Sequence, residues 1–172
     1  MKPYGGLTWD EIVVPTELAE VVDPIDYQRV VMNPGATWDY FPGHYDPEYA
    51  RRHGQPTIFV NTMHTAGFVD RIATGWAGPY SRVVRRKVSL LGSFYAGDSM
   101  VGRGRVVDKR VESNGDVHRH LVDLEIAVYN QRDELCCPAE VTLELLSSSL
   151  SVGLLHTVRR EAGHNPTLGE EP

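Results

Sequence analysis

Apolar residues recur in short alternating runs over the second half of the chain, which is typical of β-strands. Strands are expected over residues 82–90, 99–112, 117–129 and 139–146. Asn114-Gly115 lies between the second and third runs, and this dipeptide is a strong signal for a tight hairpin turn. The alternation in the third run is imperfect, as expected for a sheet that packs on a helix. The pattern therefore predicts an antiparallel meander.

The first half of the chain carries loop and helix signals. Residues 7–23 are expected to form an irregular lead-in with one short strand. Asp26 is expected to cap a helix that ends near Asn33-Pro34-Gly35, because proline and glycine commonly follow a helix end. Asp46 is expected to cap a second, short helix over 46–52, with proline in its first turn.

A longer helix is expected over residues 61–74. Asn61 is a good N-cap, and the dozen residues after it carry small and apolar side chains. One helix followed by an antiparallel meander that wraps it is an α+β arrangement. We expect a single domain over residues 1–155. Residues 156–172 lack periodicity and are expected to form a flexible C-terminal tail.

Composition narrows the class of protein. A net charge of −6 and a pI near 5.6 argue against a nucleic-acid partner. The chain has no apolar run of membrane-spanning length, and its first residues do not resemble a secretory signal, so we expect a cytoplasmic protein without membrane contact. The two cysteines are adjacent and indicate neither a disulfide framework nor a zinc site. We expect no metal and no cofactor.

Asp39 and His44 are candidate acid-base residues. Pro42-Gly43 lies between them and cannot continue a helix, so the two side chains belong to a folded loop that can point both into one cleft. A carboxylate and an imidazole of different proton affinity suit the movement of a proton to one end of a bond and of water to the other. By spacing alone, solvated surface residues or helix caps are the commoner interpretation.

The residues around this pair resemble the signature of the MaoC-like (R)-specific enoyl-CoA hydratases and dehydratases. The shared pattern is Asp39, two residues, proline, one residue, His44, and the small residue Ala50 six positions later. The family usually has glycine before the aspartate and asparagine two positions after it, where this chain has Trp38 and Phe41. The resemblance implies a hot-dog fold, with an antiparallel sheet around a central helix, and catalytic roles for Asp39 and His44.

A second block, which leads into the expected central helix, strengthens the resemblance. In the family, a backbone N–H at the start of that helix polarises the thioester carbonyl, which implies that Asn61 and Thr62 bind the substrate oxygen. A helix N-terminus suits this role, because its free N–H groups and partial positive charge stabilise a developing enolate. The family most often has His-Gly where this chain has Val60-Asn61. Residues 58–61 and 70–79 are similar to the small hot-dog subunit of steroid side-chain hydratases, in which two non-identical hot-dog chains pair.

The resemblance implies a hydro-lyase that adds water to a trans-2-enoyl-CoA, giving a 3-hydroxyacyl-CoA, or runs the reverse dehydration. It implies an acyl-CoA substrate and a homodimer or a heteromer with another hot-dog chain. Two alternatives stay open. A non-catalytic hot-dog partner is one, although a purely structural subunit has no need of both Asp39 and His44. A thioesterase is the other, and Asp70 is the only candidate for the carboxylate that it needs on the central helix.

Overall fold

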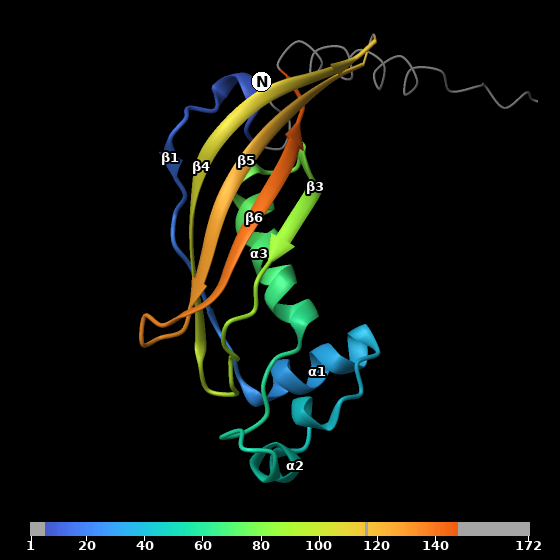
Figure 1. The fold of residues 1–172 in the computed structure, drawn as a ribbon, viewed down its shortest axis with the longest axis vertical. Coiled ribbons are helices and arrows are strands. Elements are labelled where there is room, and N and C mark those ends of the chain that lie inside the picture. Colours follow the sequence, from blue (N-terminus) through green and yellow to red (C-terminus); the bar gives the residue numbers. More distant parts are fainter. Residues whose placement is uncertain (1–5, 116, 148–172) are drawn as a thin grey trace, which may run out of the picture.

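A six-stranded antiparallel sheet curves around one long helix in the computed structural model, which describes residues 6–115 and 117–147 (Figure 1). The predicted α+β arrangement is confirmed. The helices are α1 (Tyr27–Thr37), α2 (Pro47–Arg52) and α3 (Thr62–Ala77), with short 3-10 turns η1 (Trp9–Glu11) and η2 (Pro42–His44). The strands are β1 (Thr16–Glu17), β2 (Val21–Pro24), β3 (Ser81–Val88), β4 (Ser99–Asn114), β5 (Val117–Tyr129) and β6 (Leu135–Leu145).

The strands follow the order β1-β4-β5-β6-β3, and β2 also pairs with β4. Asn114 pairs with Val117, and Gly115 has a φ of 61°, so the predicted tight hairpin between β4 and β5 is confirmed. β3 pairs with β6 along one side only. Within residues 6–115 and 117–147, its other side forms no strand pairing and is an edge of the sheet.

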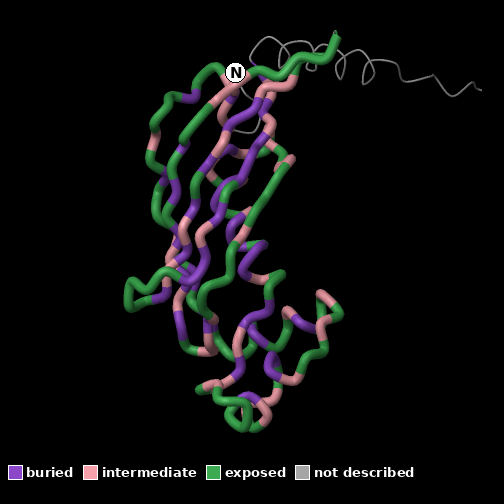
Figure 2. Tube along the Cα trace, viewed as in Figure 1, coloured by how far each residue is buried: buried purple, intermediate pink, exposed green. Residues whose placement is uncertain are grey.

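The core lies between α3 and the inner face of the sheet. Residues three or four apart along α3 form its buried stripe, which includes Thr65, Phe68, Val69 and Ile72. Alternate residues of the long strands face this stripe, as the pleat of a sheet requires. Figure 2 shows buried segments along α3 and along the strands that cover it. Figure 1 shows α1 beside the end of α3 where that helix begins, with α2 farther from α3 at the bottom of the view.

Several predicted boundaries are wrong, and the lead-in contains two short strands, β1 and β2, instead of the one expected. α1 continues through Pro34 to Thr37, because a proline in the last turn removes only one hydrogen bond, and here the Pro34 ring is buried. α3 does not stop at Gly75. It continues to Ala77, and Gly78 ends it by donating its backbone N–H to the carbonyl of Thr74. β6 begins at Leu135, four residues earlier than expected, because buried Cys136 and Cys137 extend the strand.

The predicted tail, residues 156–172, and the predicted domain boundary at residue 155 lie outside the described residues, so the extent of the domain stays a prediction. No helix in the described part of the chain has both the length and the apolar character needed to cross a membrane.

β4 approaches α3 closely at Gly102. A Cβ atom there would overlap the side chain of Ile72 and press against the ring of Phe68, and all three residues are in the core. We expect Gly102→Val to lower the free energy of unfolding by about 1–3 kcal/mol, the usual cost of overpacking. Gly75→Ala is the control, because its Cβ would meet no atom within 4 Å. Alanine in a helix should raise the stability by up to about 1 kcal/mol.

Urea unfolding of both variants measures this difference. Equal stability of Gly102→Val and the unaltered chain would show that the helix and the sheet are not in close contact at this point.

Candidate active site

The end of α1 positions Asp39. The helix closes with Trp38 in the left-handed region, at a φ of 58°. The carbonyl of Pro34 then accepts the backbone N–H groups of both Trp38 and Asp39, the latter at 3.0 Å. Asp39 therefore follows directly on a fixed helix end, and its side chain keeps 40% of its surface exposed.

The η2 turn positions His44. The backbone N–H of His44 donates to Phe41, and the N–H of Phe59 donates to the carbonyl of Gly43 at 3.3 Å. A Cβ atom at Gly43 would overlap the rings of Phe41 and Phe59, so only glycine fits between them. The same two rings contact the imidazole of His44 edge-on, with centroids 5.4 and 5.0 Å from it. Packing of this kind leaves the ring 8% exposed and fixes its orientation.

The predicted pair comes together. Nε2 of His44 lies 3.4 Å from Oδ2 of Asp39. Nδ1 of the same ring lies 2.7 Å from the carbonyl oxygen of Phe59, and a carbonyl only accepts, so Nδ1 carries the hydrogen. A neutral imidazole then presents the lone pair of Nε2 beside a carboxylate. Two acceptors at this distance are suited to hold a water molecule that donates one hydrogen to each, or to share a proton.

The start of α3 provides backbone donors. Asn61 is the N-cap, as predicted, and its side chain accepts the N–H of His64 at 2.9 Å. The side-chain nitrogen Nδ2 of Asn61 donates to Oγ1 of Thr37 at 2.8 Å, and this bond connects the start of α3 to the end of α1. In the described part of the chain, no hydrogen bond uses the backbone N–H groups of Asn61 and Thr62. These two groups can therefore bind an oxygen that carries negative charge.

A cavity of about 250 Å³ joins His44 to the start of α3. One wall is formed by His44 and by residues 59–62 and 65, so both predicted oxygen-binding residues line it. The facing wall is the loop of residues 90–94, which sequence reasoning missed. Leu90 and Leu91 in this loop are 49% and 65% exposed, and no local pattern in the sequence indicated that the loop lies beside α3. Asp39 does not line this cavity and reaches it through His44.

The other candidate residues have local partners. Asp46 caps α2, as predicted, by accepting the N–H groups of Glu48 and Tyr49. Asp70 forms an ion pair with Arg86 of β3 and does not line the cavity at His44. Burial raises the pKa of the Asp70 carboxyl, and Arg86 only partly offsets that effect. The carboxylate that a thioesterase would need is therefore held against an edge strand.

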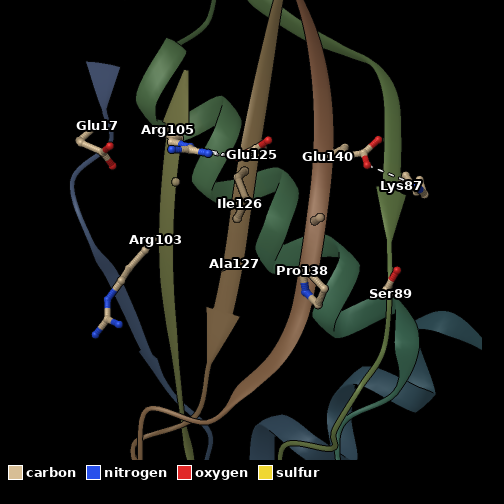
Figure 3. A pocket seen from close by; sticks show the side chains of 12 residues that line it. Glu17, Lys87, Ser89, Arg103, Arg105, Glu125, Ile126, Ala127, Pro138 and Glu140 are labelled. Carbon is tan, nitrogen blue, oxygen red and sulfur yellow. Dashed lines mark hydrogen bonds and ion pairs between the residues drawn. The ribbon is translucent and has the colours of Figure 1, made fainter. Parts of the chain in front are cut away.

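A larger concavity, of about 500 Å³, lies on the face of the sheet away from α3 (Figure 3). Its charged side chains pair across neighbouring strands, as in Arg105 with Glu125 and Lys87 with Glu140. These ion pairs are more than half exposed on both sides, so each contributes little to stability. The predicted acid-base residues, Asp39 and His44, do not line this concavity.

The family model described as the MaoC like domain matches residues 16–125. A curated relative from Mycobacterium tuberculosis, the 3-oxo-4,17-pregnadiene-20-carboxyl-CoA hydratase beta subunit, is 35% identical over 71 residues. That match covers 41% of this chain and 55% of the relative, so the chain spans about half the length of this protein.

Two solved structures share the fold. The ChsH1-ChsH2 complex from Mycobacterium tuberculosis contains a chain with a TM-score of 0.68 and 28% identity, over 77% of this chain and 98% of that one. The unliganded R-hydratase PhaJ1 from Pseudomonas aeruginosa matches with a TM-score of 0.72 and 19% identity, over 83% and 88% of the two chains. The predicted hot-dog fold and the resemblance inferred from the sequence are confirmed.

Proposed function

The chain belongs to the MaoC-like domain family, and from this premise we propose that it adds water to a trans-2-enoyl-CoA, or runs the reverse dehydration. The observation that carries the proposal is the Asp39–His44 pair, in which the Nε2 lone pair faces a carboxylate at 3.4 Å. The cavity beside His44 is also lined by Asn61 and Thr62, whose backbone N–H groups form no hydrogen bond in the described part of the chain. A proton acceptor and an oxygen-binding site therefore share one small space.

In the proposed reaction, His44 acts as the base toward water, and Asp39 orients the water and relays the proton. The water oxygen forms a bond to the β-carbon of the enoyl group as one proton of the water moves to Nε2 of His44. The π electrons of the double bond move toward the thioester oxygen, where the N–H groups of Asn61 and Thr62 stabilise the negative charge. The pair then delivers one proton to Cα, which gives the 3-hydroxyacyl-CoA. Dehydration follows the same steps in reverse.

The alternative of a non-catalytic hot-dog subunit draws support from the relative, which is named as a beta subunit. The alignment of Nε2 with Asp39 favours catalysis, because packing alone does not require a carboxylate next to a buried imidazole. The thioesterase alternative is weakened by the pairing of Asp70 with Arg86. We further propose that the substrate is an intermediate of lipid or steroid side-chain degradation. The proposal is by analogy with the relative, which is named as a subunit of a 3-oxo-4,17-pregnadiene-20-carboxyl-CoA hydratase.

The catalytic pair can be tested by substitution. Asp39→Asn and His44→Ala should each lower the rate of enoyl-CoA hydration by about 10²-fold or more, the usual contribution of a general acid-base group. Asp46→Asn and His53→Ala are matched controls, because asparagine also caps helices well and His53 is exposed. Crotonyl-CoA hydration gives the rates, and circular dichroism checks the fold. Near-normal rates in both pair variants would remove Asp39 and His44 from the chemistry.

The oxygen-binding role can be tested at the backbone. Asn61 has a φ of −80°, which proline can adopt, so Asn61→Pro removes the N–H without forcing a new backbone conformation. Asn61→Gly removes the same side chain but keeps the N–H. We expect the glycine variant to stay active and the proline variant to lose about 10²-fold or more in kcat. Thr62→Ala and Thr62→Pro repeat the comparison at the next residue. Equal activity within both pairs would show that the donor lies elsewhere.

The number of chains in the assembled protein can be tested by measuring its molecular mass in solution. Among residues 6–115 and 117–147, one side of β3 has no strand partner and can offer its backbone groups to another chain. The ChsH1-ChsH2 structure is a complex of two named components. We propose a homodimer or a heteromer with a second hot-dog chain. Light scattering should report at least twice the chain mass of 19.2 kDa. A fully active monomer would contradict this proposal.

A further inference from the structure

Thr65 lies one turn into α3 and carries a hydroxyl group without a partner. The residue is only 4% exposed, and it lines the cavity at His44. In the described part of the chain, no hydrogen bond uses its Oγ1 atom. A hydroxyl that is buried in this way loses bonds to water and gains none from the protein. The Thr65 hydroxyl therefore points to a ligand rather than to the stability of the fold.

Another threonine of the same helix bonds its hydroxyl within the helix. Oγ1 of Thr74 donates to the carbonyl of Asp70 at 2.8 Å. This bond to the residue four positions earlier is available to any threonine in a helix. Thr65 does not make it, although the carbonyl of Asn61, four positions earlier, accepts only two backbone N–H groups at 3.2 and 3.4 Å. The Thr65 hydroxyl is thus left available.

The position of Thr65 directs its hydroxyl to the oxygen-binding end of the cavity. Three partnerless side-chain atoms of the described residues are closed off from solvent, and Oγ1 of Thr65 is not among them, so it keeps some accessible surface. Helical side chains tilt toward the helix N-terminus, and residues three or four apart share one face. Thr65 therefore leans toward the first turn of α3, where the backbone N–H groups of Asn61 and Thr62 form no hydrogen bond among the described residues.

Three donors are then available at this end of the cavity. The side chain of Asn61 is not one of them, because its oxygen caps α3 and its nitrogen donates to Thr37. The donors are the backbone N–H groups of Asn61 and Thr62 and the hydroxyl of Thr65. A carbonyl oxygen has two lone pairs, which the two N–H groups can fill. An enolate oxygen carries negative charge and can accept a third hydrogen bond, so the third donor suits the charged intermediate better than the substrate.

We propose that the hydroxyl of Thr65 donates to the thioester oxygen as its negative charge develops, and that Thr65 is a further catalytic residue. This inference rests on the proposed hydratase function for the identity of the ligand. It adds a side-chain donor to the two backbone donors and takes no part in the proton transfers at Asp39 and His44.

The effect on catalysis can be measured with matched variants of the full-length chain. Thr65→Val removes the hydroxyl and keeps the branched shape, whereas Thr65→Ser keeps the hydroxyl. We expect Thr65→Val to lower kcat for crotonyl-CoA hydration by about tenfold or more with little change in KM, because the donor acts on the charged oxygen. Thr65→Ser should retain most of the rate. Thr74→Val is the control, because Thr74 bonds within α3 and does not line the cavity.

The same hydrogen bond can be measured without hydration. Acetoacetyl-CoA forms an enolate that differs from the keto form in its ultraviolet absorbance. At a fixed pH, we expect the ratio of bound enolate to bound keto form to be about tenfold lower in Thr65→Val than in the unaltered chain and in Thr74→Val. Urea unfolding should show that Thr65→Val is at least as stable as the unaltered chain, since a methyl group needs no hydrogen-bond partner.

An unchanged enolate ratio in Thr65→Val, or no binding of acetoacetyl-CoA to the unaltered chain, would overturn the inference. Thr65→Ala gives the same comparison if Thr65→Val fails to fold. Crotonyl-CoA hydration separates the two proposals. Hydration with an enolate ratio that does not depend on Thr65 defeats this inference alone, whereas a ratio that depends on Thr65 without hydration defeats the proposed reaction alone.

Discussion

The site depends on one hydrogen bond, from Nδ1 of His44 to the carbonyl of Phe59. It fixes the tautomer, so that the free lone pair of the neutral ring lies on Nε2, the nitrogen beside Asp39. It also joins the η2 turn to the segment that leads directly into α3. The imidazole of His44 and the N-terminus of α3 are thereby held relative to each other. The close approach of the two segments requires glycine at position 43, where a side chain would overlap the rings of Phe41 and Phe59.

Local signals in the sequence predicted much of the frame. The caps at Asp26, Asp46 and Asn61 are confirmed, because a short polar side chain before a helix meets its backbone donors without any distant partner. The hairpin at Asn114-Gly115 is also confirmed, because Gly115 can adopt the positive φ of 61° that its turn has without any distant partner. The extent of α1 could not be predicted, because the sequence does not show that Pro34 is buried within the last turn of the helix.

The site itself was predictable only in part. The spacing of Asp39 and His44 and the family signature pointed to the pair, but not to the contacts that orient it. Phe41, which replaces a polar residue usual in the family, packs its ring edge against His44, and sequence reasoning gave only the loss of a polar group. The loop of residues 90–94 forms a cavity wall only because the fold brings it beside α3, and no local pattern encodes that contact.

We propose above all that Asp39 and His44 carry out the proton transfers of enoyl-CoA hydration. Incubation of the purified full-length chain with crotonyl-CoA in D₂O, followed by NMR of the product, tests this claim most directly. We expect 3-hydroxybutyryl-CoA with a single deuterium at Cα from the unaltered chain, and none of this product from a chain that lacks both side chains. Crotonyl-CoA recovered unchanged, from the chain alone and from its assembly with a hot-dog partner, would contradict it.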